Sequence, residues 1–102
     1  MEKLSGAQRK FLRSLAHGLK PCVHIGHRGI TATVIQAVND ALDAHELIKV
    51  KYIECREKER KAEMADQIQA ETFCDMVGAI GHTAIFFRIQ KDPAKRKITL
   101  PL

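Results

Sequence analysis

The sequence predicts one α/β (α+β) domain in which helices cover a mixed four-stranded sheet. Segments with helical periodicity alternate with short apolar runs in the order α-β-α-β-α-β-β. Two strand–helix–strand units predict parallel strand pairing, whereas the last two strands have a hairpin pattern and predict an antiparallel pair. A chain of 102 residues has the size of a single domain, so we expect residues 1–102 to form one.

The first predicted helix begins at Ser5, which has capping-box spacing with Gln8. Gly18 is expected to end this helix in the left-handed conformation, and Pro21 prevents its continuation. Apolar side chains recur about every 3.6 residues and predict one packing face, made of Leu4, Ala7, Phe11, Leu12, Leu15 and Leu19. The opposite side carries cations, namely Arg9, Lys10 and Arg13, with Lys20 just beyond the helix. This side is either a solvated helix surface or a surface that binds an anion.

Residues 22–25 form the first predicted strand, and the glycine loop, residues 26–29, follows it directly. Gly26 and Gly29 let the backbone turn sharply and leave no Cβ in the way of a ligand. The residues between them, His27 and Arg28, are basic or become so on protonation. A plain strand-to-helix turn is the alternative interpretation of this spacing.

A second helix is predicted over about residues 31–44, with Thr31 as its cap and Ile30 and Ile35 as its hydrophobic staple. Free N–H groups at the start of a helix, next to Arg28, are suited to a phosphate. The outward side of this helix is acidic, so we expect a polyanion to meet only its first turn. His45, at the helix end, is expected to be partly buried.

Residues 47–100 are predicted to form a strand, a third helix and a hairpin, followed by a short apolar segment. A strand is predicted over residues 47–53 and a third helix over about residues 57–72, whose charged start at residues 57–61 is interpreted as solvated surface. Residues 75–80 and 83–89 form a hairpin pattern around Gly81-His82, with Phe86 and Phe87 expected in the core on opposite sheet faces. Residues 98–100 are apolar enough to add a short edge strand.

Positive charge is concentrated at the two ends of the chain. The net charge is +5 over residues 1–30, −4 over residues 31–87 and +4 over residues 88–102. Such asymmetry favours a polyanionic partner over a general role in solubility.

Other composition features exclude several classes of protein. No apolar run approaches the roughly 20 residues of a membrane span, and the start of the chain lacks the apolar core of a signal peptide, so a cytoplasmic protein is expected. Cys22, Cys55 and Cys74 are isolated in sequence and predict buried free thiols, with neither zinc nor a disulfide. No cofactor is expected, because no Walker loop or metal-binding histidine spacing is present.

An enzyme is not expected either. The serines occur without a nucleophile-elbow motif, and the carboxylates are concentrated on surface-like positions of the second and third helices. Aromatic residues are few and do not form the basic-aromatic string of an RNA-recognition motif. A loop that grips nucleic-acid backbone, with nearby basic residues supplying charge, remains compatible with the sequence.

Several motifs in order resemble the CRM-domain family, in particular its small bacterial single-domain members of the YhbY type. They are LAH (15–17) with LKP (19–21), GHRGIT (26–31), HELIKVK (45–51), GHT (81–83) and KITLP (97–101). This resemblance implies an RNA-binding domain with a fold similar to the C-terminal domain of bacterial translation initiation factor three. It further implies association with precursors of the large ribosomal subunit, and plant relatives build the domain into organellar intron-splicing factors.

We therefore expect a non-catalytic RNA-binding protein, acting as a monomer in assembly of the large ribosomal subunit. The expected RNA-binding residues are Gly26, His27, Arg28, Gly29 and Thr31 around the loop, Arg9, Lys10, Arg13 and Lys20 near the first helix, and Lys95, Arg96 and Lys97 in the tail. The alternative is a protein-interaction module that binds an acidic partner through its basic surface. A small hydrolase or nuclease is disfavoured by the lack of an acid–base or metal constellation.

Overall fold

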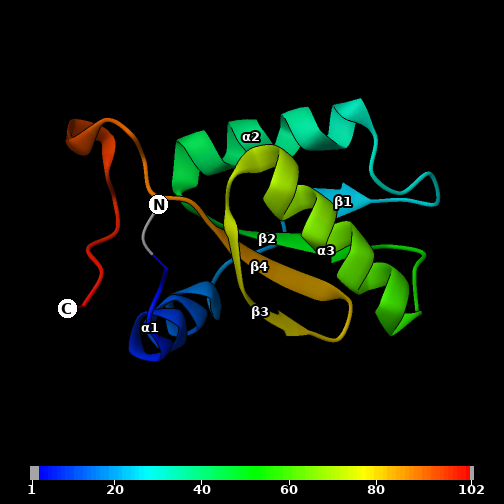
Figure 1. Cartoon of the computed structure of the whole chain (residues 1–102), viewed down its shortest axis with the longest axis horizontal. Helices are drawn as coiled ribbons and strands as arrows, with labels where there is room; N and C mark the ends of the chain where they lie inside the picture. The colour runs from blue at the N-terminus through cyan, green and yellow to red at the C-terminus, as the bar shows by residue number, and fades with distance from the viewer. Residues whose placement is uncertain (1–2, 102) are drawn as a thin grey trace.

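A mixed four-stranded sheet organises the chain, with helices on both of its faces (Figure 1). The computed structural model describes residues 3–101, so the predicted domain limits at 1 and 102 lie outside it. The elements are α1 (Gly6–Ala16), β1 (Val23–Ile25), α2 (Ala32–His45), β2 (Leu47–Tyr52), α3 (Lys58–Thr72), β3 (Asp75–Ile80), β4 (Thr83–Phe87) and the 3₁₀ turn η1 (Pro93–Lys95). The predicted fold class and element order are confirmed.

The strand order is β1-β2-β4-β3. β1 pairs with β2 in parallel, with Val23 opposite Val50, whereas β4 is antiparallel to both β2 and β3. Parallel pairing was therefore correctly predicted for β1 and β2 but wrongly for β2 and β3. Those two strands run in the same direction, but the hairpin returns β4 into the space between them.

Successive side chains of each strand point to opposite faces of the sheet, and apolar side chains on both faces form two cores. β2 sends Ile48, Val50 and Tyr52 towards α2 and α3, and Leu47 towards α1. Phe86 and Phe87 are buried in different clusters, which confirms that they face opposite sides. The second core is smaller, and Ile98 and Leu100 of the C-terminal tail pack against it beside α1.

Two predicted helix starts are confirmed. The Ser5 Oγ accepts from the Gln8 amide at 3.1 Å, and the Gln8 Oε1 accepts from the Ser5 amide at 2.9 Å, which completes the capping box. Thr31 Oγ1 accepts from the Val34 amide at 3.2 Å, and Ile30 and Ile35 both pack against the first core.

Several local predictions are wrong. Gly18 does not have a positive φ, because α1 already ends at Ala16 and the chain leaves through an ordinary turn. Leu15 and Leu19 are 43% and 39% exposed, and Leu19 lies beyond the end of α1. His45 is exposed, because the chain reverses at the next residue and buries Glu46 instead.

Glu46 ends α2 and holds the C-terminal tail. It has a φ of 63°, and its side chain is only 1% exposed. Its Oε1 accepts from the amides of Lys97 at 2.6 Å and Ile98 at 3.0 Å, and its Oε2 accepts from the amide of Gln90 at 2.9 Å. Residues 98–100 therefore do not form the expected edge strand, because this carboxylate, rather than a strand edge, takes up tail amides.

Tyr52 ties the end of β2 to α3. Its ring is buried in the first core, and its hydroxyl donates to the Lys61 carbonyl at 3.3 Å. Burial raises the pKa of Tyr52 to about 12, with a smaller contribution from nearby Cys55.

Replacing Glu46 by Ala should destabilise the fold by about 3 kcal/mol, because three amides lose a charged acceptor. Urea unfolding measures this change, and limited proteolysis should cut the tail faster in the variant. Glu63→Ala, which removes an exposed carboxylate from α3, is the matched control and should change stability by less than about 0.5 kcal/mol. Equal stability of the two variants would contradict the role given to Glu46.

The Tyr52 hydroxyl should make stability fall in strongly alkaline solution. Between pH 10 and about 12 the folded protein retains a proton that the unfolded chain has released, so this contribution is complete below pH 10 and decreases as the pH rises. The slope reaches at most about 1.4 kcal/mol per pH unit. Urea midpoints at pH 9, 10 and 11 should therefore fall more steeply for the wild type than for Tyr52→Phe, and parallel profiles would refute the assignment.

Candidate nucleic-acid interface

Strand direction brings three connecting segments together at one end of the sheet, here called the loop end. β1, β2 and β3 all run towards this end, so the glycine loop, residues 53–57 and the turn at Gly81-His82 meet there (Figure 1). The Ile53 amide donates to the Ile25 carbonyl at 2.9 Å, and the Tyr52 amide donates to the His82 carbonyl at 2.7 Å. These bonds fix the three segments relative to one another.

The glycine loop is a tight turn closed by a hydrogen bond of 3.0 Å from the Gly29 amide to the Gly26 carbonyl. Gly29 is buried and has a φ of +69°, a conformation that favours glycine. A Cβ on Gly29 would lie 3.7 Å from Arg60 Nη2 and 3.8 Å from Met64 Sδ. Gly26 has neither constraint, and His27 and Arg28 are exposed at the tip of the turn.

The start of α2 follows this turn within two residues. Because Thr31 Oγ1 takes only the Val34 amide, the amides of Ala32 and Thr33 point out of the helix start without an intrahelical acceptor. Exposed amides at the positive end of a helix dipole, next to an exposed Arg28, can bind an anionic group.

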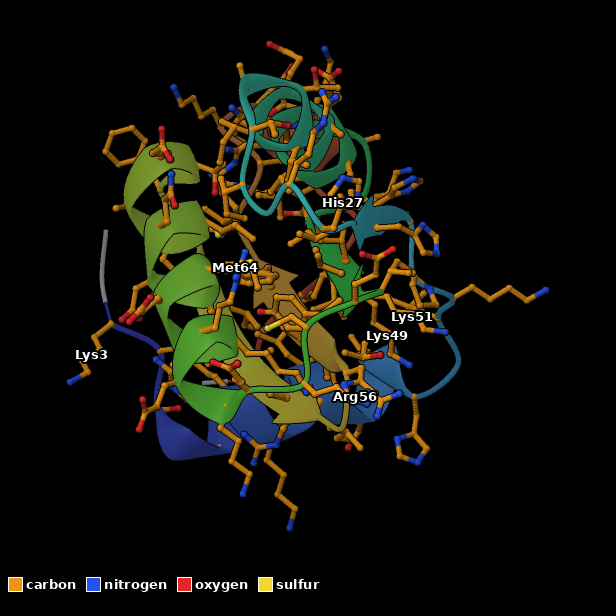
Figure 2. The ribbon with its side chains drawn as sticks, turned by 90° about the vertical axis from the view of Figure 1, so that its right-hand side faces the viewer. Lys3, His27, Lys49, Lys51, Arg56 and Met64 are labelled. Carbon is orange, nitrogen blue, oxygen red and sulfur yellow. The ribbon has the colours of Figure 1, made fainter. Side chains whose placement is uncertain are left out.

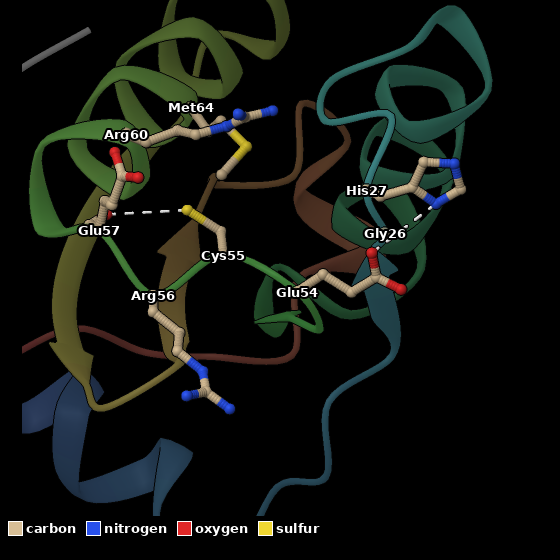
Figure 3. A pocket seen from close by; sticks show the side chains of 8 residues that line it. All are labelled: Gly26, His27, Glu54, Cys55, Arg56, Glu57, Arg60 and Met64. Atoms are coloured by element: carbon tan, nitrogen blue, oxygen red, sulfur yellow. Dashed lines mark hydrogen bonds and ion pairs between the residues drawn. The ribbon is translucent and has the colours of Figure 1, made fainter.

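A cavity of about 180 Å³ lies between the glycine loop and the start of α3 (Figure 3). Its lining residues are Gly26, His27, Glu54, Cys55, Arg56, Glu57, Arg60 and Met64. His27 Nδ1 lies 3.8 Å from Glu54 Oε2, and this pair is ionic only when the imidazole is protonated. Both side chains are largely exposed, so the pair contributes little to stability.

The structure adds cations that the sequence interpretation assigned to an ordinary helix surface. Residues 56–61, at the start of α3, follow a strand that ends beside the glycine loop, so their cations belong to the loop end. Figure 2 looks onto this end and shows His27, Lys51 and Arg56 on the same side of it. Residues 26–31 and 51–61 together hold six Lys/Arg and three Glu. The parallel direction of β1 and β2, which the sequence does predict, was the signal that could have identified them.

The arginines of α1 have structural partners. Arg9 Nη1 donates to the Met76 carbonyl at 2.8 Å, and Arg13 Nη1 donates to the Val77 carbonyl at 3.0 Å. Gly78 makes room for this packing, since a Cβ there would lie 2.7 Å from Arg13 Cδ. Both guanidinium groups are therefore tied to carbonyls of the edge strand β3, a structural role that neither interpretation of this helix side included.

The other predicted cations are exposed but dispersed. Lys10 lies on α1 and Lys20 on the connection to β1, over the sheet face opposite α2 and α3. Lys95, Arg96 and Lys97 are exposed in the tail, where Arg96 Nε donates to the Gln90 carbonyl at 2.8 Å. Figure 1 shows the tail and the glycine loop at opposite ends of the long axis, so the predicted residues do not form one continuous surface.

Residues 3–101 contain no group of three or more His, Cys, Asp or Glu placed to hold a metal ion, and none of the helices in this part of the chain is long and apolar enough to cross a membrane. The three cysteines are free, but only Cys74 is buried, whereas Cys22 is exposed and Cys55 is intermediate. The expectation of buried thiols is thus right for Cys74, where burial raises the thiol pKa, and wrong for Cys22.

Comparison with known proteins gives consistent matches over most of the chain. The family model described as the CRS1 / YhbY (CRM) domain matches residues 4–88. A Haemophilus influenzae protein named RNA-binding protein is 39% identical over 101 residues, which cover 99% of this chain and 98% of that protein. The Bacillus subtilis protein named Probable RNA-binding protein YqeI is 34% identical over 98 residues, covering 96% and 99% of the two chains.

A solved structure has the same fold. The solution structure of the hypothetical protein SAV1595 from Staphylococcus aureus superposes with a TM-score of 0.80 at 33% sequence identity. The match covers 97% of this chain and 100% of that one.

Proposed function

The chain belongs to the CRS1 / YhbY (CRM) domain family, and from that membership we propose that it binds RNA through the loop end. The observation that carries the proposal is the convergence of the glycine loop, the free start of α2 and the cations of residues 51–61. The names of its relatives, which describe RNA-binding proteins, support RNA as the polyanion.

In the proposed mechanism, the RNA backbone is the main contact. A phosphate lies against the amides of Ala32 and Thr33, with Arg28 beside it. Arg56 and Arg60 line the adjacent cavity, where they can contact the next phosphate along the strand. Gly26 and Gly29 contribute by leaving no side chain between the backbone and the RNA.

Residues outside the loop end extend this contact. Lys10 and Lys20 carry exposed ammonium groups, and Arg9 and Arg13 have further guanidinium donors besides the ones used on β3. Lys95, Arg96 and Lys97 would be reached only by an RNA that follows the molecule along its 38 Å length.

We further propose that the RNA is ribosomal, within precursors of the large ribosomal subunit, and that the protein acts without catalysing a reaction. The resemblance to YhbY-type proteins motivates this assignment. RNA crosslinked to the protein in cells and then sequenced should map to large-subunit ribosomal RNA. Crosslinks distributed over messenger RNAs without enrichment in ribosomal RNA would contradict it.

Arg28→Ala should weaken binding to ribosomal RNA fragments about threefold or more and should lower the slope of log affinity against log salt by roughly 0.7. Lys95→Ala, the same change of charge at the opposite end, should have less than about half of this effect. Affinity measured at several salt concentrations provides the comparison. If both variants bind like the wild type, the loop end is not the RNA surface. If the wild type binds an acidic protein better than RNA, the protein-interaction alternative is favoured.

Gly26→Asp should abolish most RNA binding while the protein stays folded. Gly26 has no positive φ, and a Cβ added to it would have no atoms within 4 Å, so the substitution adds negative charge without strain. Asp is also favoured at the first position of such a turn. Gly26→Asn is the neutral control: it adds the same bulk without the charge, and it should weaken binding clearly less than Gly26→Asp. Equal binding by the two variants would show that no phosphate lies beside the glycine loop.

A further inference from the structure

A second hollow lies at the loop end, between the first two turns of α3 and the end of the β3–β4 hairpin. Its volume is about 400 Å³. The lining residues are Tyr52, Arg56, Lys58, Lys61, Ala62, Ala65, Met76, Ala79 and Gly81. We call it the alanine hollow, since three of its residues are alanines. It is distinct from the smaller cavity beside the glycine loop, although Arg56 lines both.

A β-bulge creates the floor of this hollow. In a regular strand, Met76 and Ala79 would point to opposite faces, because they are three residues apart. The register of β3 against β4 shifts between Met76 and Gly78, so that Met76 pairs with Phe86 and Ala79 pairs with Ala84. Phe86 and Ala84 both belong to the core beneath α3, and the bulge therefore turns Met76 and Ala79 towards this helix.

Small residues keep the space above this floor open. Ala62 and Ala65 on α3 face Ala79 and Gly81 on the hairpin, and none of them has a side chain long enough to fill the gap. Lys61 holds the two walls together, because its Nζ donates to the Gly81 carbonyl at 3.2 Å and lies 2.7 Å from His82 Nδ1. The hollow is thus formed before any ligand binds.

The chemistry of the lining selects its occupant. The floor and walls are largely apolar, whereas the rim carries Arg56, Lys58 and Lys61, and no acidic side chain is among the described lining residues. A ligand that matches both parts has a flat, weakly polar body joined to an anion. An unpaired nucleobase with its phosphate has this character, and RNA-binding proteins commonly hold such bases on apolar or aromatic surfaces. Pockets for small ligands start at about 300 Å³, so the volume is sufficient.

We propose that the alanine hollow binds one unpaired nucleobase of the RNA, with an adjoining phosphate held by Arg56, Lys58 and Lys61. This inference rests on the proposed RNA-binding function and specifies its ligand as single-stranded or bulged RNA. Because Arg56 borders both cavities, a strand whose phosphate lies at the glycine loop can place a neighbouring base in the hollow.

Filling the hollow tests the proposal without changing any charge. The variants are Ala62→Leu and Ala79→Leu, each made as a single substitution. Both positions are exposed, so each variant should fold. Ala70→Leu, at an exposed position of α3 that does not line the hollow, is the matched control. The probes are a fluorescent adenosine hexamer and a hexamer of the same backbone that lacks all bases. Thermal melts confirm the fold of each variant.

The wild type and Ala70→Leu should bind the adenosine hexamer at least about fivefold more tightly than the abasic one, as expected for one held base. Ala62→Leu and Ala79→Leu should lose this preference while binding the abasic hexamer like the wild type. If both folded variants still prefer the adenosine hexamer to the abasic one, the hollow proposal is overturned, but the proposed RNA-binding function is not. If the wild type binds neither hexamer nor any ribosomal RNA fragment, the proposed function fails, and the hollow proposal with it.

A second measurement locates the base directly. With ¹³C-methyl methionine, titration with adenosine monophosphate should shift the Met76 methyl signal through the ring current of the base, whereas ribose 5-phosphate should not. Met64, which lines the cavity beside the glycine loop, reports on the other site. A Met76 signal that is unmoved at saturating nucleotide would overturn the proposal.

Discussion

The carboxylate of Glu46 is the interaction on which the arrangement of the rest depends. It lies where α2 ends and β2 begins, and it accepts hydrogen bonds from three tail amides in an almost fully buried position. A buried carboxylate without such partners would be very costly, so the tail is held in this place. There it covers the second core with Ile98 and Leu100. Arg88 adds a second polar tie at the same end, where its guanidinium donates to Asn39, Thr72 and Asp43.

These ties close one end of the molecule, and strand direction leaves the other end open. Every strand that runs away from Glu46 ends in a short connection at the loop end. A sheet with two covered faces holds these connections in fixed positions, as is common for binding loops on a rigid scaffold. The tail cations stay at the closed end because Glu46 holds their backbone. The tail cations, which are distant from the glycine loop in sequence, are therefore also distant from it in space. Only the loop-end cations adjoin the glycine loop.

The sequence predicted features that depend on local patterns. Element order, both helix caps and the opposite burial of Phe86 and Phe87 follow from periodicity and capping chemistry that act over a few residues. The features it missed depend on contacts between distant segments. Arg9 binds β3 because a bulge offers it a carbonyl, and Glu46 is buried because tail amides some 50 residues away surround it. The candidate site divides in the same way: the glycine loop is a local motif that the sequence shows, whereas the cations of residues 56–61 join it only through the pairing of β1 with β2.

The loop-end cations differ in how firmly the protein holds them, which would give them different tasks in the RNA binding proposed above. Arg28 and Lys51 are exposed and free to follow a phosphate, so ordering them on binding costs side-chain entropy, and they are suited to sequence-independent attraction. Lys61 is already fixed between Gly81 and His82, and Arg60 lies against the buried Gly29. Cations positioned in advance lose less entropy and accept a phosphate only where the geometry allows it. Lys61 borders the alanine hollow, so discrimination between RNA conformations should arise there, whereas general affinity should come from Arg28 and Lys51.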